Sequence, residues 1–167
     1  MSRRIDRQAL LEEFTSEVRR YQNAQDEFDD AAAERLGINR TDLRCLDLID
    51  LAGRMTAGQL ASESGLSTGA VTTLVDRLER AGYVRRVRDD VDRRRVLVEL
   101  TDAARTRAGE IWAPIGQESA ERMAAYSDAE VEFLLDFLKG SREFLARHLA
   151  RIKEQPGAAP PQDRRLG

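Results

Sequence analysis

The hydrophobic period of this chain changes at Gly82, and that change most constrains its fold. Before it, the apolar residues of 71–78 recur every three to four positions, the spacing of one helix face. After it, residues 83–88 and 95–100 alternate with a period of two, which is typical of strands. The charged stretch 89–94 lies between them. The sequence therefore predicts a helix followed directly by a β hairpin.

The exposed face of this helix has an unusual composition. Ser67 precedes the helix, is suited to cap it and is the first of the expected DNA contacts. The face opposite the apolar residues carries Thr68, Gly69, Thr72, Thr73 and Arg77. Short hydroxyl side chains near a helix start, with a cation one turn later, fit a major groove and can hydrogen-bond base edges or phosphates. The alternative is an ordinary solvated face, where glutamate and lysine are more usual.

A second short helix is expected just before the first, over residues 56–66. Thr56 and Gln59 have the spacing of a capping box, and Ser64-Gly65 marks the end. Two short helices joined by a tight turn make a helix-turn-helix, whose second helix enters the DNA groove. Many short helical hairpins share this pattern, so it is only moderately specific.

The predicted hairpin tip is rich in arginine. Six arginines and three aspartates lie between residues 85 and 95, whereas the whole chain has a formal charge of -3. The expected DNA contacts in this region are Arg88, Arg93, Arg94 and Arg95. A cationic hairpin beside a groove-reading helix is placed to touch phosphates or to enter the minor groove. The alternative is a soluble turn in which the aspartates pair with the arginines, and a salt bridge from Asp92 is expected to hold one of them.

Together these residues resemble the MarR family of winged helix-turn-helix transcription regulators, whose signature joins a recognition helix to a D-x-R-R-like wing and a closing L-T. The matching residues are Leu66-Ser67, 71–78, Gly82-Tyr83-Val84, Arg88, Asp92-Arg93-Arg94 and Leu100-Thr101. The helix order on both sides extends the resemblance from Leu10 to Ile152. The resemblance implies a DNA-binding homodimer.

Four more helices are expected outside the hairpin and the helix-turn-helix. Apolar residues at helical spacing run from Leu10 to Leu36, and Asn39 and Gly53 bracket a second helix. Thr101 is suited to cap a third helix, which Pro114 is expected to kink or interrupt. The last helix begins at a capping box of Ser127 and Glu130 and runs to about residue 153.

The terminal helices carry more apolar surface than one small domain can cover. The last helix has two apolar stripes, and an apolar face that wide usually packs on a second chain as well as on its own core. The expected dimer interface consists of Leu10, Phe14, Phe133, Phe137, Leu138, Phe144, Leu145 and Leu149. The alternative is a monomer with a large core.

The predicted fold is mainly α, a winged helix-turn-helix with a two-stranded β wing and long N- and C-terminal dimerisation helices. The N-terminal dimerisation helix occupies 1–36 and the DNA-binding module 38–101. The C-terminal dimerisation helices occupy 102–153. Residues 154–167 hold three prolines without apolar periodicity and are expected to form a disordered tail.

Composition sets limits on compartment and chemistry. No apolar run is long enough for a signal peptide or a membrane helix, so the protein is expected to be cytoplasmic. The chain has one histidine, His148, and one cysteine, Cys45, and it lacks the H-E-x-x-H, C-x-x-C and glycine-loop motifs. We therefore expect no catalysis, no metal site and no cofactor. A buried structural thiol is favoured for Cys45 over an oxidant sensor.

The family resemblance also implies a small aromatic or phenolic effector, bound between the reading module and the dimerisation helices. The residues suited to line such a pocket are Tyr21, Phe28, Leu46 and Trp112, with Arg44 or Asp47 as polar partners. The alternative for each is an ordinary core or surface position.

The sequence as a whole indicates a sequence-specific regulator that binds double-stranded DNA. We expect a dimeric repressor on a pseudo-palindromic operator near its own gene, with recognition helices about 34 Å apart, released by the effector. The alternative is a winged-helix interaction or structural module without specific DNA binding.

Overall fold

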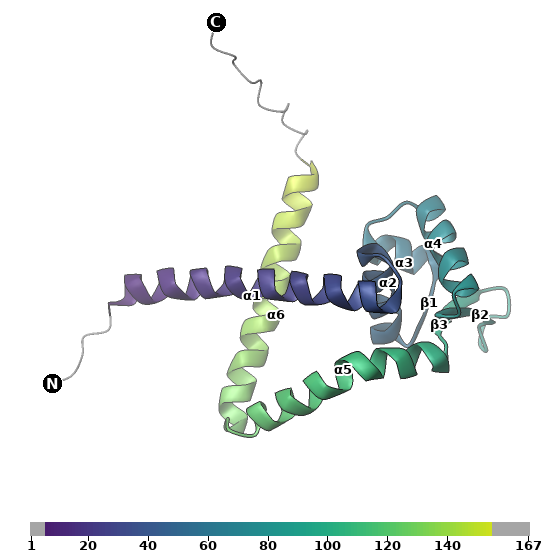
Figure 1. The fold of residues 1–167 in the computed structure, drawn as a ribbon. Coiled ribbons are helices and arrows are strands. Elements are labelled where there is room, and N and C mark those ends of the chain that lie inside the picture. The colour runs from purple at the N-terminus through teal and green to yellow at the C-terminus, as the bar shows by residue number, and fades with distance from the viewer. Residues whose placement is uncertain (1–5, 155–167) are drawn as a thin grey trace, which may run out of the picture. The chain divides into compact units, whose positions relative to one another are not determined.

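The computed structural model describes residues 6–154, so the predicted tail falls outside the described residues, apart from Glu154 (Figure 1). The elements in chain order are α1 (Arg7–Leu36), α2 (Arg40–Ala52), β1 (Arg54–Thr56), α3 (Ala57–Ser64), α4 (Thr68–Arg80), β2 (Val84–Arg88), β3 (Val96–Leu100), α5 (Asp102–Met123) and α6 (Asp128–Glu154). The predicted mainly α fold is confirmed. No helix in this range is long and apolar enough to cross a membrane.

Helix boundaries follow the local capping signals. Asn39 accepts a hydrogen bond from the Asp42 amide and begins α2. Thr56 and Gln59 form both halves of a capping box on α3, and Ser67 accepts from the Ala70 amide at the start of α4. Each cap satisfies an amide that has no partner within its own helix. The predicted helix starts at these residues are confirmed.

The sheet has three antiparallel strands in the order β1-β3-β2, so the prediction of two strands missed one. Strands β2 and β3 form the predicted hairpin, with Val84 opposite Leu100 and Arg88 opposite Val96. Strand β1 pairs with the other edge of β3, where Met55 lies opposite Val98. Because Arg54–Thr56 is only three residues long, it carries no detectable period.

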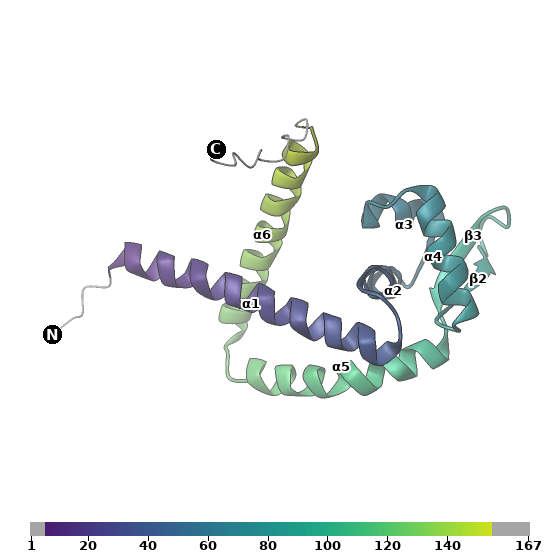
Figure 2. The same ribbon diagram turned by 45° about the horizontal axis from the view of Figure 1, so that its top comes forward.

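A single core joins the helix-turn-helix to the sheet. Its buried side chains come from α2, α3, α4, β1, β2, β3 and the start of α5: Cys45, Leu46, Ile49, Met55, Leu60, Val71, Leu74, Val75, Leu78, Tyr83, Val84, Val98, Leu100 and Ala104. The apolar face of α4 is thus buried, as predicted. Its opposite face remains exposed beside the hairpin (Figure 2).

Gly82 connects α4 to β2 in a conformation that favours glycine. Its φ is 77°, in the left-handed region, where a Cβ atom is strained. The Gly82 carbonyl accepts a hydrogen bond from the Thr101 hydroxyl at 2.7 Å, which ties the end of the hairpin to the end of the helix. The wing is therefore held against α4 at its base.

The chain divides into two compact units that meet between Pro114 and Ile115. The first holds the helix-turn-helix, the sheet and α1, and the second holds the rest of α5 and all of α6. Helix α5 continues through Pro114, so the proline does not interrupt it. In the second unit, Ser127 and Glu130 form the predicted capping box of α6.

Candidate nucleic-acid interface

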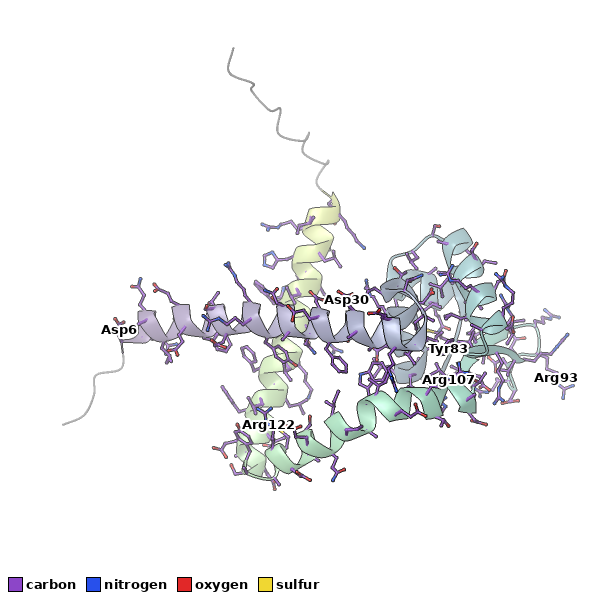
Figure 3. The ribbon with its side chains drawn as sticks, viewed as in Figure 1. Asp6, Asp30, Tyr83, Arg93, Arg107 and Arg122 are labelled. Carbon is purple, nitrogen blue, oxygen red and sulfur yellow. The ribbon has the colours of Figure 1, made fainter. Side chains whose placement is uncertain are left out.

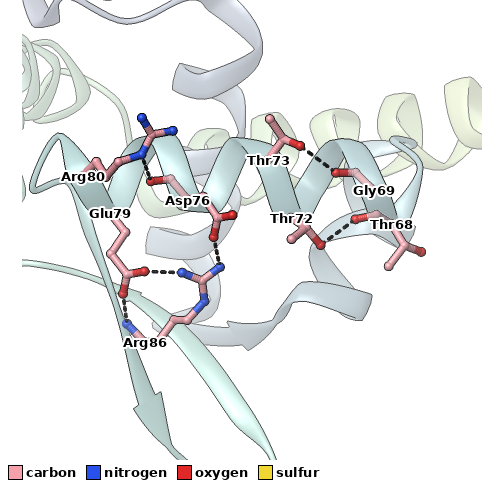
Figure 4. A network of polar contacts seen from close by, with 8 residues as sticks. All are labelled: Thr68, Gly69, Thr72, Thr73, Asp76, Glu79, Arg80 and Arg86. Carbon is pink, nitrogen blue, oxygen red and sulfur yellow. Dashed lines mark hydrogen bonds and ion pairs between the residues drawn. The ribbon is translucent and has the colours of Figure 1, made fainter.

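The exposed face of α4 begins with two threonines whose hydroxyls are already engaged. Thr72 Oγ1 donates to the Thr68 carbonyl at 3.0 Å, and Thr73 Oγ1 donates to the Gly69 carbonyl at 3.1 Å (Figure 4). Both side chains are exposed. Because each hydroxyl proton is donated to a carbonyl of the same helix, the threonine side chains present oxygen lone pairs and methyl groups to an outside partner. Base edges with amino donors and thymine methyl groups match that surface.

Arg77 occupies a different environment from the threonines. Its Nε and one terminal nitrogen donate to the two carboxylate oxygens of Asp42, at 3.0 and 2.5 Å. Asp42 lies at the start of α2 and is almost fully buried. The geometry thus assigns this guanidinium to holding α4 against α2. The predicted contact between Arg77 and DNA stays a prediction and requires this pair to open.

A second arginine contact joins α4 to the wing, and the sequence analysis missed it. The Arg86 guanidinium on β2 contacts Asp76 at 2.5 Å and also pairs with Glu79 (Figure 4). The Arg86 amide also donates to Glu79, at 3.2 Å. Hydrogen bonding to Asp76 raises the pKa of Arg86, so this side chain remains charged. We call Arg86, Asp76 and Glu79 the Arg86 cluster.

The wing tip is ordered by aspartates. Asp89 accepts from the Val91 amide at 2.9 Å, and this bond is the largest cause of the lowered pKa of its carboxyl. Asp92 accepts from the Arg94 amide at 3.1 Å. These short-range bonds shape the turn in which the arginines sit.

The pairing of the wing arginines differs in part from prediction. Asp92 bonds a backbone amide, and the carboxylate that faces an arginine at the tip is Asp89, 3.7 Å from Arg95. Arg88 donates to the Arg93 carbonyl at 3.4 Å. Within residues 6–154, no carboxylate pairs with the side chain of Arg93 or Arg94. Figure 3 shows Arg93 projecting from the tip of the hairpin.

Comparisons with known proteins agree with this geometry. The profile of the MarR family matches residues 38–96. An uncharacterised HTH-type transcriptional regulator, YcgE of Bacillus subtilis, is 39% identical over 127 residues, which cover 76% of this chain and 82% of the relative. The chain belongs to the MarR family. Like other members of the MarR family, it is a DNA-binding transcription regulator.

Solved structures place the fold in the same family. E. coli MarR without ligand is 25% identical, with a TM-score of 0.52 over 76% of this chain and 95% of that one. MepR, from a multidrug-resistant S. aureus clinical isolate, is 18% identical, with a TM-score of 0.64 over 79% of this chain and 96% of that one. The winged helix-turn-helix prediction is therefore confirmed.

The MarR-type module of this chain contains a cavity of about 460 Å³ beside α2. Its wall is mainly apolar and includes Leu46, Tyr83 and Trp112. The polar groups are Asp47 and an ion pair between Asp50 and Arg105, 2.5 Å apart. Burial, with a smaller contribution from Asp50, raises the pKa of Asp47. The cavity thus offers an aromatic surface and carboxylate acceptors.

Only some of the residues predicted to line the effector pocket lie at this cavity. Leu46 and Trp112 line it, whereas Tyr21 and Phe28 do not. The Phe28 ring packs edge-on against Trp112, with centroids 6.1 Å apart, and Tyr21 is 64% exposed. Trp112, Asp47 and Arg44 also line a second cavity, of about 580 Å³. The pocket assignment stays a prediction.

Cys45 is fully buried, as the sequence predicts for a structural thiol. Burial is the main cause of the raised pKa of its thiol, which favours the unreactive protonated form. Among residues 6–154, no group of three or more histidine, cysteine or acidic side chains is arranged to hold a metal ion.

The terminal helices expose the apolar residues that the sequence assigned to a dimer interface. No residue within Asp128–Glu154 is buried, and Phe133 is 71% exposed. The predicted interface residues that are exposed include Leu10, Phe14, Phe137, Leu138, Phe144, Leu145 and Leu149. The His148 ring packs against Phe144, with centroids 4.4 Å apart. A role of these apolar residues in dimerisation stays a prediction.

Proposed function

We propose that this protein is a dimeric repressor that reads a pseudo-palindromic operator with α4 and contacts the flanking DNA with its wing. The observation that carries the proposal is the pair of surfaces on one compact unit. One is a hydroxyl-lined helix face, and the other is a hairpin tip whose Arg93 and Arg94 lack carboxylate partners among the described residues. Base edges are read from the major groove, whereas arginines hold phosphates or the minor groove.

The dimer is proposed to form through the apolar faces of α1 and α6. In both helices apolar side chains recur at helical spacing and stay between about a third and three quarters exposed within the described residues. A two-fold dimer brings two α4 helices to half-sites about 34 Å apart. That spacing selects an operator with inverted half-sites.

The wing test compares arginines that differ in pairing. Arg94→Ala removes a side chain without a carboxylate partner among residues 6–154, and Arg95→Ala removes one that faces Asp89. If Arg94 contacts a phosphate, its loss weakens operator binding and reduces the slope of log K against log salt by about 0.9. Arg95→Ala is expected to change the slope less. An unchanged slope for Arg94→Ala would assign the wing to a structural role.

We further propose that the 460 Å³ cavity takes a small neutral phenol that lowers operator affinity. A phenol stacks on Trp112 and donates its hydroxyl to Asp47. A benzoate adds negative charge beside Asp47 and Asp50, and the Arg105 guanidinium of the wall is already paired with Asp50. A tenfold preference for the non-binding conformer corresponds to about 1.4 kcal/mol of coupling.

Trp112 is the only tryptophan in the sequence, so its fluorescence reports on this cavity directly. Titration with phenol is expected to quench the emission in a saturable way, and benzoate is expected to bind more weakly. Ala108→Leu, which places a larger side chain in the cavity, is the variant that tests the site and should weaken the quenching. Equal quenching of this variant and the unaltered protein would argue against the site.

A further inference from the structure

The face of α4 that carries the threonines continues into acidic residues. Asp76 follows Thr72 by four positions and Thr73 by three, so the three side chains share one face of the helix. Glu79 lies one turn beyond Asp76. Carboxylates on a helix that enters a groove repel the phosphates on either side of it. The C-terminal half of α4 therefore needs compensation for these two charges.

The Arg86 cluster provides that compensation from another element. One terminal nitrogen of Arg86 lies 2.5 Å from Asp76, and the other pairs with Glu79 (Figure 4). The Arg86 amide bonds the remaining Glu79 oxygen at 3.2 Å. The bonds run from β2 to two consecutive turns of α4, so they join the wing to the recognition helix as well as balancing charge.

We propose that Arg86 is a positioning residue, which neutralises Asp76 and Glu79 and fixes the wing against α4 without itself touching DNA. The inference rests on the proposed function, because it specifies how the same surface tolerates phosphates. Both terminal nitrogens of Arg86 are occupied by carboxylates, whereas Arg93 and Arg94 at the tip have no such partners within the described range. Arg86 thus affects DNA binding through Asp76 and Glu79, whereas the arginines at the wing tip are proposed to contact DNA directly.

A double-mutant cycle separates the two roles. A duplex is first selected from a random-sequence library by the unaltered protein. Its affinity is then measured for Arg86→Ala, for Asp76→Asn/Glu79→Gln and for the three substitutions combined. We expect Arg86→Ala to weaken binding about tenfold when the carboxylates are present and less than about twofold when they are absent. If Arg86 acted only as a strut, Asp76→Asn/Glu79→Gln would by itself weaken binding about as much as Arg86→Ala, whereas charge compensation leaves the affinity of that variant unreduced. If Arg86 contacted a phosphate directly, its loss would weaken binding equally in both backgrounds.

The control is Arg85→Ala, on the same strand. Arg85 pairs with Glu99 at 2.8 Å and, among the described residues, makes no hydrogen bond or ion pair with α4, so its loss removes equal charge without exposing Asp76 or Glu79. Its effect is expected to stay below about threefold. Arg86→Gln repeats the test with most of the side chain kept, and thermal unfolding verifies that each variant is folded.

The double-mutant cycle has three possible outcomes. Rescue by the neutral amides supports the Arg86 inference. An equal loss from Arg86→Ala in both backgrounds overturns it and leaves the proposed DNA reader intact. Failure of the unaltered protein to select any sequence overturns the proposed function, and the Arg86 inference with it.

Discussion

At the scale of single residues, the pair of Asp42 and Arg77 shows that the role of a polar side chain depends on the partner it bonds. Arg77 lies on the exposed side of α4 by its helical position, and it follows Thr73 by one turn. Its guanidinium nevertheless turns to Asp42, which is 35 positions earlier in the chain and almost fully buried. A buried carboxylate is stable only with such a partner. The pair therefore links α2 to the recognition helix.

Arg77→Ala is predicted to destabilise the fold by about 3 kcal/mol, because it leaves the Asp42 charge buried without its partner. Asp42→Asn/Arg77→Ala should be less destabilised, since no charge remains. The matched control is Arg80→Ala on the same helix, where a change within about 0.5 kcal/mol is expected. Urea unfolding measures all three. A loss from Arg77→Ala no larger than that of the control would contradict this assignment.

Cys45 gives a second prediction at this scale. Its folded-state pKa is raised by burial, so the thiol remains protonated at pH values where the unfolded chain loses its proton. Stability is thus unaffected below the unfolded pKa of about 8.5 and falls as pH rises above it. Cys45→Ala should lose less stability between about pH 7.5 and 9.5 than the unaltered chain. Iodoacetamide should label the folded protein far more slowly than the urea-unfolded one; equal rates would contradict a buried thiol.

At the scale of elements, the features set by neighbouring residues were predictable and those set by distant partners were not. The caps at Asn39, Thr56 and Ser67 depend on residues within three positions, so the sequence contains the whole signal. Strand β1 exists because β3 pairs with it across more than 40 residues, and three residues show no period of their own.

The same distinction holds for the site. Composition indicated the hydroxyl face of α4 and the cationic hairpin. The partners of Arg77 and Arg86 were missed because they come from α2 and from α4, and a single sequence does not indicate which of several aspartates an arginine meets. Pro114 was expected to kink or interrupt α5; the helix is not interrupted there, and a kink stays a prediction. A proline removes one internal hydrogen bond, and a long helix retains many others.

We expect the exposed threonines of α4 to determine which bases the protein prefers. Thr72→Ala/Thr73→Ala should change the sequences selected from a random duplex library, while affinity for random DNA changes less than about twofold, because we propose that these exposed side chains read base edges. Thr106→Ala is the matched control, since Thr106 makes the same bond to the carbonyl four residues earlier, at 3.0 Å, but on α5. Equal losses on all sequences would refute direct readout.

At the scale of the whole molecule, the exposed apolar surface of α6 is the feature that the described residues of one chain leave unexplained. Its side chains are apolar at core spacing, yet none of them is buried within one protomer. Apolar surface of this extent normally marks an interface. The regulator is therefore expected to function as a pair of chains, and a monomer is expected to bind one half-site weakly.

Phe133→Glu is predicted to shift the protein from dimer to monomer, because it places a charge in the proposed interface. Glu132→Ala, next to it on the polar side of α6, should leave the dimer unchanged. Sedimentation velocity measures both. A monomer for the unaltered chain, or a dimer for Phe133→Glu, would contradict a dimer interface on this surface of α6.

The most direct test of the central claim is fluorescence anisotropy of the purified protein on DNA flanking its own gene, with random-sequence competitor and a salt titration. We predict tight, competitor-resistant binding of two protomers per site, with affinity falling steeply as salt rises. Binding to every flanking fragment no tighter than to random DNA would contradict an operator at its own gene and favour a winged-helix interaction module.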